Sequence, residues 1–162
     1  MAATHQFSES NLVGEVVADG IANINFGSAD DHELNTTTYP ITRGDDSFEK
    51  YIRCKFTDTW TEISSMKFWK SLGNYVTGES IKASANATYA TPTATPNADS
   101  AIPITEGTAL SLNSAEGEST IVYGASGVTG YTGYIRLQTH TTGSTPSGSV
   151  NQKQFTFQFD EV

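Results

Sequence analysis

The chain has 162 residues, a mass of 17.4 kDa and a formal net charge of −9 at pH 7. This length suits a single domain, and the acidic balance argues against binding to nucleic acid or to an anionic membrane surface. The 23 Thr, 17 Ser and 14 Gly residues favour strands and turns over helices. We therefore expect an all-β protein with at most a short helix.

The sequence carries neither a membrane-span pattern nor a secretion-signal pattern. No apolar stretch approaches the roughly 20 residues that a membrane helix needs, and the first residues lack the basic and apolar regions of a signal peptide. We therefore expect synthesis in a cytoplasm and no membrane partner. The one cysteine, Cys54, excludes an internal disulfide. Because it lies in phase with Ile52 and Phe56, Cys54 is predicted to be buried as a small hydrophobic residue.

The first part of the chain is predicted to hold an arm and a hairpin. Residues 1–12 are polar and lack periodicity, so we expect an N-terminal arm that is either flexible or ordered only by a neighbour, followed by a single β-sandwich domain over 13–162. Residues 14–26 are rich in strand formers and are interrupted at Asp19 and the glycine after it, which predicts a hairpin turn there. A polar connection follows over 30–46.

Three strands are predicted in the middle of the chain, over 48–56, 63–69 and 79–85, because apolar and polar residues alternate there. The first of them directs three residues inward and three outward: Ile52, Cys54 and Phe56 against Tyr51, Arg53 and Lys55. Residues 89–103 contain three of the five prolines, which cannot donate to a β-ladder. This segment is therefore predicted to be a loop or an edge segment.

The last part of the chain carries the clearest strand pattern. Short strands are predicted at 108–112 and 119–123, and two longer ones at 134–142 and 154–160, with a turn at 145–148 joining the longer pair. The final strand is expected to be a core strand. Five side chains of the longer pair are predicted to face the core: Ile135, Leu137, Phe155, Phe157 and Phe159.

These elements predict the class of the fold. Seven to nine short strands separated by turns indicate a two-sheet antiparallel β-sandwich. Both a jelly-roll and an immunoglobulin-like topology fit the pattern, because periodicity does not determine how the strands are connected.

The residues that carry chemistry form no recognisable catalytic pattern in the sequence. Asp30, Asp31 and Glu33 could supply oxygen ligands to a cation, but their spacing matches no ordered ligand loop, and a solvated acidic loop is the preferred interpretation. Asp160 and Glu161 are adjacent on a strand, so they point to opposite faces and cannot act on one substrate. We therefore expect no enzyme activity, no cofactor and no metal site.

Four aromatic side chains suggest a second class of function. Trp60, Trp69, Tyr75 and Tyr89 could form a platform that stacks on sugar rings, as in a carbohydrate-binding or receptor-binding module. Packing between the sheets or at a subunit contact is the commoner fate of such residues.

Three segments, 54–78, 88–103 and 134–162, resemble small virion proteins of tailed bacterial and archaeal viruses. The most specific part is the ending, where a Tyr-Ile-x-Leu-Gln strand and a Thr-Pro-x-Gly turn precede a last strand that closes in Phe-x-Phe-Asp-Glu. The resemblance implies a non-enzymatic β-sandwich on the capsid exterior, made in the host cytoplasm, that acts as a capsid decoration or cementing protein. A head-to-tail or tail structural protein is the alternative.

The resemblance also suggests partners. We expect binding to the major capsid protein or to other virion proteins, and self-association into a homo-oligomer such as a trimer. The net charge of −9 would keep such a protein soluble before assembly. Residues 1–12 and 89–103 are the segments expected to reach neighbouring subunits, because extended chains can add to the edge of a partner's sheet.

Overall fold

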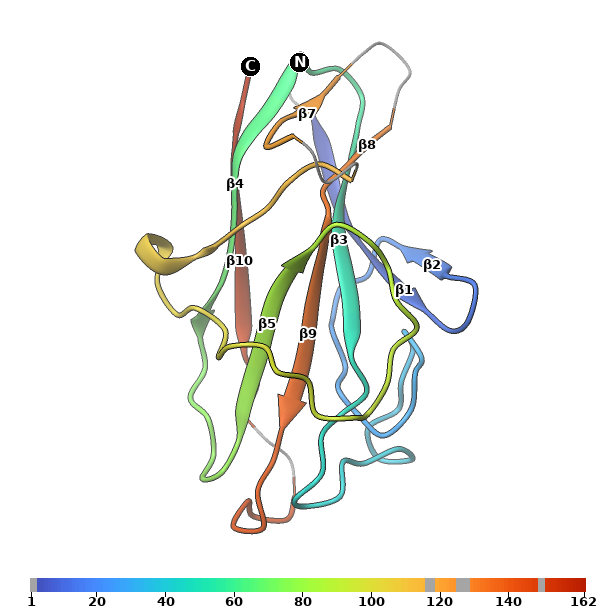
Figure 1. Ribbon diagram of the computed structural model, residues 1–162, viewed down its shortest axis with the longest axis vertical. Helices are drawn as coiled ribbons and strands as arrows, with labels where there is room; N and C mark the ends of the chain where they lie inside the picture. Colours follow the sequence, from blue (N-terminus) through green and yellow to red (C-terminus); the bar gives the residue numbers. More distant parts are fainter. Residues whose placement is uncertain (1–2, 116–118, 125–128, 149–150) are drawn as a thin grey trace.

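A computed structural model describes residues 3–115, 119–124, 129–148 and 151–162, and these residues form an elongated, two-layered β-structure (Figure 1). No described residue belongs to a helix long and apolar enough to cross a membrane. One 3-10 turn, η1 (Glu106–Thr108), interrupts the strands. The strands are β1 (Thr4–Asn11), β2 (Val16–Asp19), β3 (Lys50–Thr57), β4 (Glu62–Leu72), β5 (Ser80–Asn86), β6 (Leu110–Ser111), β7 (Val122–Tyr123), β8 (Gly130–Tyr131), β9 (Tyr134–His140) and β10 (Gln154–Glu161).

The strands form two antiparallel sheets, which confirms the predicted β-sandwich. The larger sheet has the order β2-β1-β3-β9-β5, and β8 also pairs with β3. The smaller sheet has the order β10-β4-β6, and β7 also pairs with β4. The described residues hold ten strands rather than seven to nine, and the strands that were not predicted are β1 and the two-residue β8.

The core between the sheets contains the residues that the alternation predicted for β3. Ile52, Cys54 and Phe56 are fully buried, as are Ile135 and Leu137 on β9. Burial raises the pKa of the Cys54 thiol to about 12, so this cysteine is the buried hydrophobic residue that was predicted and not a reactive thiolate at neutral pH.

The alternation on β4 is broken by a bulge. Ser65 has a φ of 52°, and the pairing with β10 skips from Lys67 to Ser64 at this point. The extra residue allows Ile63 and Met66, which are three positions apart, both to face the core. Strict alternation along this strand would have turned one of them to solvent.

The prediction of an N-terminal arm over residues 1–12 was wrong for its described part. Residues 4–11 form β1, which lies between β2 and β3 and pairs with both. The polar residues that hid the strand pattern are buried and hydrogen-bonded, with Ser8 Oγ donating to Asp19 and Ser10 Oγ donating to Glu15. The hairpin therefore joins β1 to β2 through residues 12–15, not at Asp19 as predicted.

The two closing strands lie in different sheets, and the final strand differs from the core strand that was predicted. β9 lies in the larger sheet between β3 and β5, whereas β10 pairs with β4 in the smaller sheet. β10 is therefore an edge strand and not a core strand. Its side chains Phe155, Phe157 and Phe159 do pack against the core, but they remain half-buried. Figure 1 shows β10 beside β4 and apart from β9.

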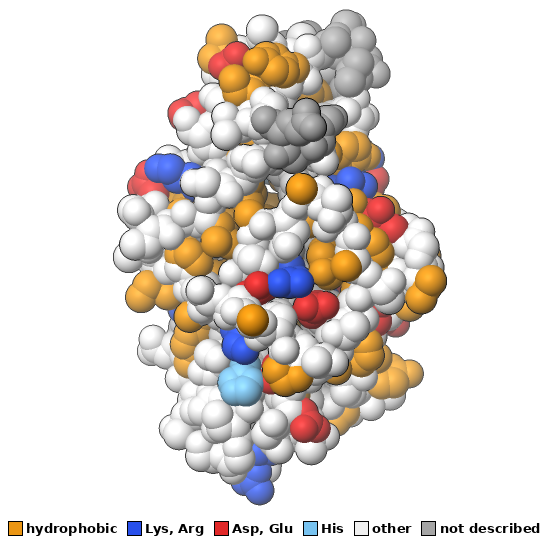
Figure 2. All heavy atoms as spheres, in the orientation of Figure 1, with side chains coloured by type: hydrophobic (Ala, Val, Ile, Leu, Met, Phe, Trp, Pro, Cys, Tyr) orange, Lys and Arg blue, Asp and Glu red, His pale blue; other side chains and the backbone are white. Residues whose placement is uncertain are grey.

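Residues 89–103 form an irregular segment, as predicted, and the larger sheet holds this segment. Arg136 donates to both carboxylate oxygens of Asp99, at 2.9 and 2.6 Å. Ala83 N donates to Ser100 O and Ile102 N donates to Ile81 O, so this segment also covers the edge of β5. Figure 2 shows acidic and basic side chains side by side at the centre of the face of the molecule that it draws.

Candidate functional site

The first candidate site is the outer backbone edge of β10. Val162 and Glu62 exchange two hydrogen bonds, of 3.0 and 3.1 Å, so the backbone groups of Val162 point toward β4. Because backbone groups alternate in direction along a strand, those of Phe155, Phe157 and Phe159 point away from β4. The start of the strand shows the same orientation. Lys70, which lies opposite Phe155, donates its N–H to Pro103 O on the far side of β4, so the backbone groups of this pair point away from each other.

The outer edge of β10 has no backbone partner among the described residues. The other long edges are occupied. Residues 100–102 bond to β5, and on the far side of β4 the carbonyl of Met66 accepts from Leu112. The edge strand β2 has only four residues, so β10 with eight is the longest open edge in the described structure.

The composition of β10 leaves this edge weakly protected. Native proteins commonly shield edges with proline, lysine or bulges on the edge strand. Residues 154–161 contain no proline and no lysine, and the bulge lies on β4 instead. Only Asp160 and Glu161, both exposed at one end, place charge on the strand. Thr and Phe favour an extended strand, so the edge is suited to pairing.

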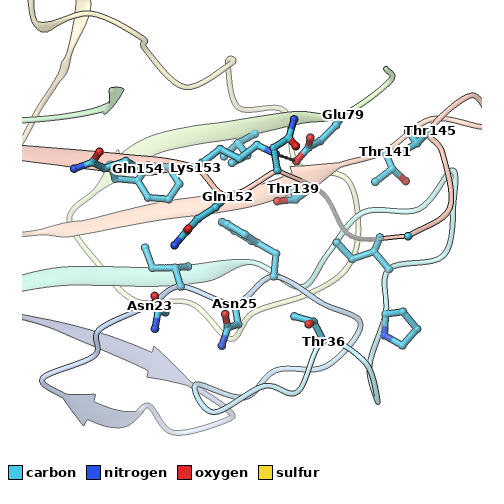
Figure 3. A pocket seen from close by; sticks show the side chains of 18 of the residues that line it. Asn23, Asn25, Thr36, Glu79, Thr139, Thr141, Thr145, Gln152, Lys153 and Gln154 are labelled. Atoms are coloured by element: carbon cyan, nitrogen blue, oxygen red, sulfur yellow. Dashed lines mark hydrogen bonds and ion pairs between the residues drawn. The ribbon is translucent and has the colours of Figure 1, made fainter. Parts of the chain in front are cut away.

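The second candidate site is a cleft of about 1190 Å³ between the sheets, beside the start of β10. Its lining includes residues 21–26 and 151–155. Figure 3 shows Asn23, Asn25 and Thr36 on one side of the cleft and Gln152 and Lys153 on the other. The polar side chains therefore come from segments that are far apart in the sequence.

One ion pair is built into the cleft. Lys153 Nζ donates to Glu79 Oε1, and both side chains are almost completely buried. The second oxygen of Glu79 accepts from Val76 N at 3.0 Å, and Lys153 lies 5.4 Å from the centre of the Tyr75 ring. Because the two charges neutralise each other, they add no net charge to the cleft.

The acidic residues considered for a cation do not form a site. Asp30 accepts hydrogen bonds from the side chain of Asn11 and from Leu12 N, at 2.8 and 2.7 Å. Asp31 accepts from Glu33 N at 3.0 Å. Among the described residues, no group of three or more His, Cys, Asp or Glu side chains could hold a metal ion. These carboxylates order the loop that follows β2.

The four aromatic residues considered for a sugar platform do not lie together. Trp60 is buried and donates to Val122 O. Tyr89 packs against Tyr51, with ring centres 5.1 Å apart, on the outer face of the larger sheet. Tyr75 contacts Lys153, which lines the cleft. Trp69 is half-buried and, as the neighbour of the inward-facing Phe68, lies on the outer face of β4.

Sequence reasoning missed both candidate sites. The Phe-rich pattern of β10 shows which face is apolar, but it does not show whether a second strand covers the outer edge. The cleft residues Asn23, Asn25 and Gln152 lie in irregular segments without periodicity, so no local signal marked them. No family model, curated protein or solved structure matches this chain.

Proposed function

We propose that this protein is a non-enzymatic structural component of a virus particle, which binds the outer face of the shell and stabilises it as a decoration or cementing protein. The observation that carries the proposal is the open eight-residue edge of β10. This edge lies within residues 134–162, the stretch with the most specific resemblance to virion proteins.

An open edge provides a means of attachment. Eight residues of strand extend over about 26 Å, and every second residue presents an unpaired N–H and C=O to an added strand. Main-chain hydrogen bonds supply affinity in this mode of binding. Contacts that are weak in one copy act together when many copies line a shell.

The two segments first expected to reach neighbouring subunits are engaged within the chain. The backbone of residues 4–11 is paired on both sides by β2 and β3. Residues 89–103 are tied to the larger sheet through Asp99 and to β5 through Ser100. We therefore propose attachment through β10, with a strand of the major capsid protein or of another virion protein as the partner.

Binding to particles that lack the protein tests the proposal. Purified protein should bind such particles stoichiometrically and raise the temperature at which they break open. Binding to tail or connector fractions in place of shells would overturn the decoration assignment and favour a head-to-tail or tail structural protein.

A pair of variants tests the edge itself. Phe159→Pro removes the ring and the outward N–H of Phe159, whereas Phe159→Ala removes the ring alone. Because that N–H is not used by β4, proline should cost little extra folding stability at this edge position. We expect Phe159→Ala to bind particles and Phe159→Pro to bind them at least tenfold more weakly. Equal binding of the two folded variants would show that the edge of β10 is not the attachment site.

A further inference from the structure

We propose that the cleft between residues 21–26 and the start of β10 binds a neutral oligosaccharide. This inference does not rest on the proposed attachment through β10, because the two features use different groups. Attachment uses the backbone along 155–161, whereas the cleft presents mainly side chains from several segments, and only Gln154 and Phe155 of β10 line it.

The size of the cleft suits a ligand larger than one small molecule. Pockets for drug-sized ligands occupy roughly 300–1,000 Å³, and this cleft has a volume of about 1190 Å³. It lies between the two sheets, with residues 23 and 25 on one side and residues 152 and 153 on the other (Figure 3). An extended chain of sugar rings could lie between these two sides without unfolding either sheet.

The polar lining is dominated by carboxamides and hydroxyls. Three carboxamide side chains at the cleft make no hydrogen bond to any described residue: Asn23 and Gln152, which are exposed, and Asn25, which is half-buried. Each carboxamide can donate two hydrogen bonds and accept two. A sugar hydroxyl also donates and accepts, so carboxamides suit it better than groups that only donate or only accept. The hydroxyls of Thr36 and Thr139 add further groups of the same kind.

The charge of the lining excludes the main alternatives. The whole chain carries a net charge of −9, yet the described lining residues include only three charged ones, Arg43, Glu79 and Lys153. Two of these form the buried ion pair. A single arginine at the lining provides no cluster for a phosphate or a sulfated glycan, which are held by several basic groups. The expected ligand is therefore uncharged.

The apolar part of the lining suits the face of a sugar ring that carries its C–H groups. Phe26 and Phe155 line the cleft and are half-buried, so part of each ring remains accessible. The ring of Phe155 is held in a stacked arrangement on Phe68, with centres 5.6 Å apart. An aromatic surface can cover the C–H groups of a sugar while neighbouring polar groups bond its hydroxyls. A peptide strand would instead be held by backbone hydrogen bonds, so an uncharged peptide serves as the competing probe.

The experiment measures binding of four neutral hexasaccharides, of maltose, cellulose, chitin and mannan type, together with a sialylated oligosaccharide and an uncharged hexapeptide. Chemical-shift titration of the folded protein reports affinity and location together. We expect at least one neutral hexasaccharide to bind with millimolar or better affinity, to shift signals from residues 23–26 and 151–155, and to outcompete the sialylated probe and the peptide.

Three variants locate the site. Asn25→Ala and Gln152→Ala should each weaken binding about three- to tenfold, as expected for loss of a hydrogen bond. Neither side chain has a partner among the described residues, so both variants should fold normally. Trp69→Ala, on the outer face of β4, should leave binding unchanged.

Three results would overturn the inference: no binding of any neutral hexasaccharide at 10 mM, a roughly tenfold preference for the sialylated probe or the peptide, or loss of binding in Trp69→Ala alone. Particle binding by Asn25→Ala and Gln152→Ala should equal that of the unmodified protein. The failure of the cleft proposal and the failure of the attachment proposal are therefore distinguishable.

Discussion

The strands β9 and β10 have the same alternating pattern but different surroundings. β9 lies between β3 and β5, and residues 87–100 cover its outer face. β10 has β4 on one side and no described strand on the other. The consequence is visible in one residue type: Gln138 on β9 is fully buried, whereas Gln158 on β10 is exposed.

This difference shows what alternation in a sequence reports. A period of two identifies which side chains share a face, because successive residues point to opposite sides. It does not report how many strands lie alongside, or whether a loop covers the polar face. The two strands of the closing segment were therefore predicted alike, although one is central and the other provides the open edge.

The largest expected difference between the strands is in their core side chains. Leu137→Ala on β9 should lower the free energy of unfolding by about 3–4 kcal/mol, because Leu137 is fully buried and the cavity cannot collapse between two neighbouring strands. Phe157→Ala on β10 should cost about 2 kcal/mol, less than the roughly 3–5 kcal/mol of a fully buried phenylalanine, because Phe157 is half-exposed already. Urea unfolding followed by fluorescence measures the free energy of unfolding of both variants. An equal or larger loss for Phe157→Ala would show that β10 is as well covered as β9.

The second expected difference is in the outward-facing glutamines. Gln138 Nε2 donates to Ser47 O and Thr95 O, at 2.9 and 3.0 Å, and Gln138 Oε1 accepts from Asn97 N. Gln138→Ala leaves buried polar groups without partners, which should cost about 2 kcal/mol. Gln158→Ala should change the stability by less than about 0.5 kcal/mol. Thermal unfolding compares the stability of the two variants. Similar losses of stability would contradict the proposed difference between β9 and β10.

The sequence predicted more of the fold than of the candidate sites. The β3 residues Ile52, Cys54 and Phe56 could be placed because a buried strand shows its period directly. β1 was missed because Ser8 and Ser10 are buried with hydrogen-bond partners on the neighbouring hairpin strand and turn, and a polar side chain does not reveal such partners.

The open edge and the cleft depend on contacts between distant segments. The edge of β10 is open because no strand of the described structure lies beyond it, which is a property of the whole sheet. The cleft brings residue 25 close to residue 152, and nothing local to either position indicates the other. Predicting them would have required the strand order, and the alternation carries no information on that order.

The smallest expected effect concerns residues 87–100, which cover the outer face of β9. Burial raises the pKa of the Asp99 carboxyl, but hydrogen bonds from Arg136 and Ser84 outweigh it and hold this pKa below its ordinary value. The unfolded chain therefore takes up a proton at a higher pH than the folded chain does. The contribution of Asp99 to stability is complete above about pH 4–5 and is lost as the pH falls through its folded pKa.

Asp99→Asn tests this contribution. The variant should be about 1–2 kcal/mol less stable at pH 7, because Arg136 loses its shortest partner but keeps Glu49 at 3.7 Å. Its stability should fall less than that of the unmodified protein between pH 5 and pH 3. Asp160→Asn, at the exposed end of β10, removes the same formal charge and controls for the change in net charge. If the two variants have the same pH dependence, the Asp99–Arg136 pair does not hold residues 87–100 on β9, and the cover over that strand depends on Gln138 instead.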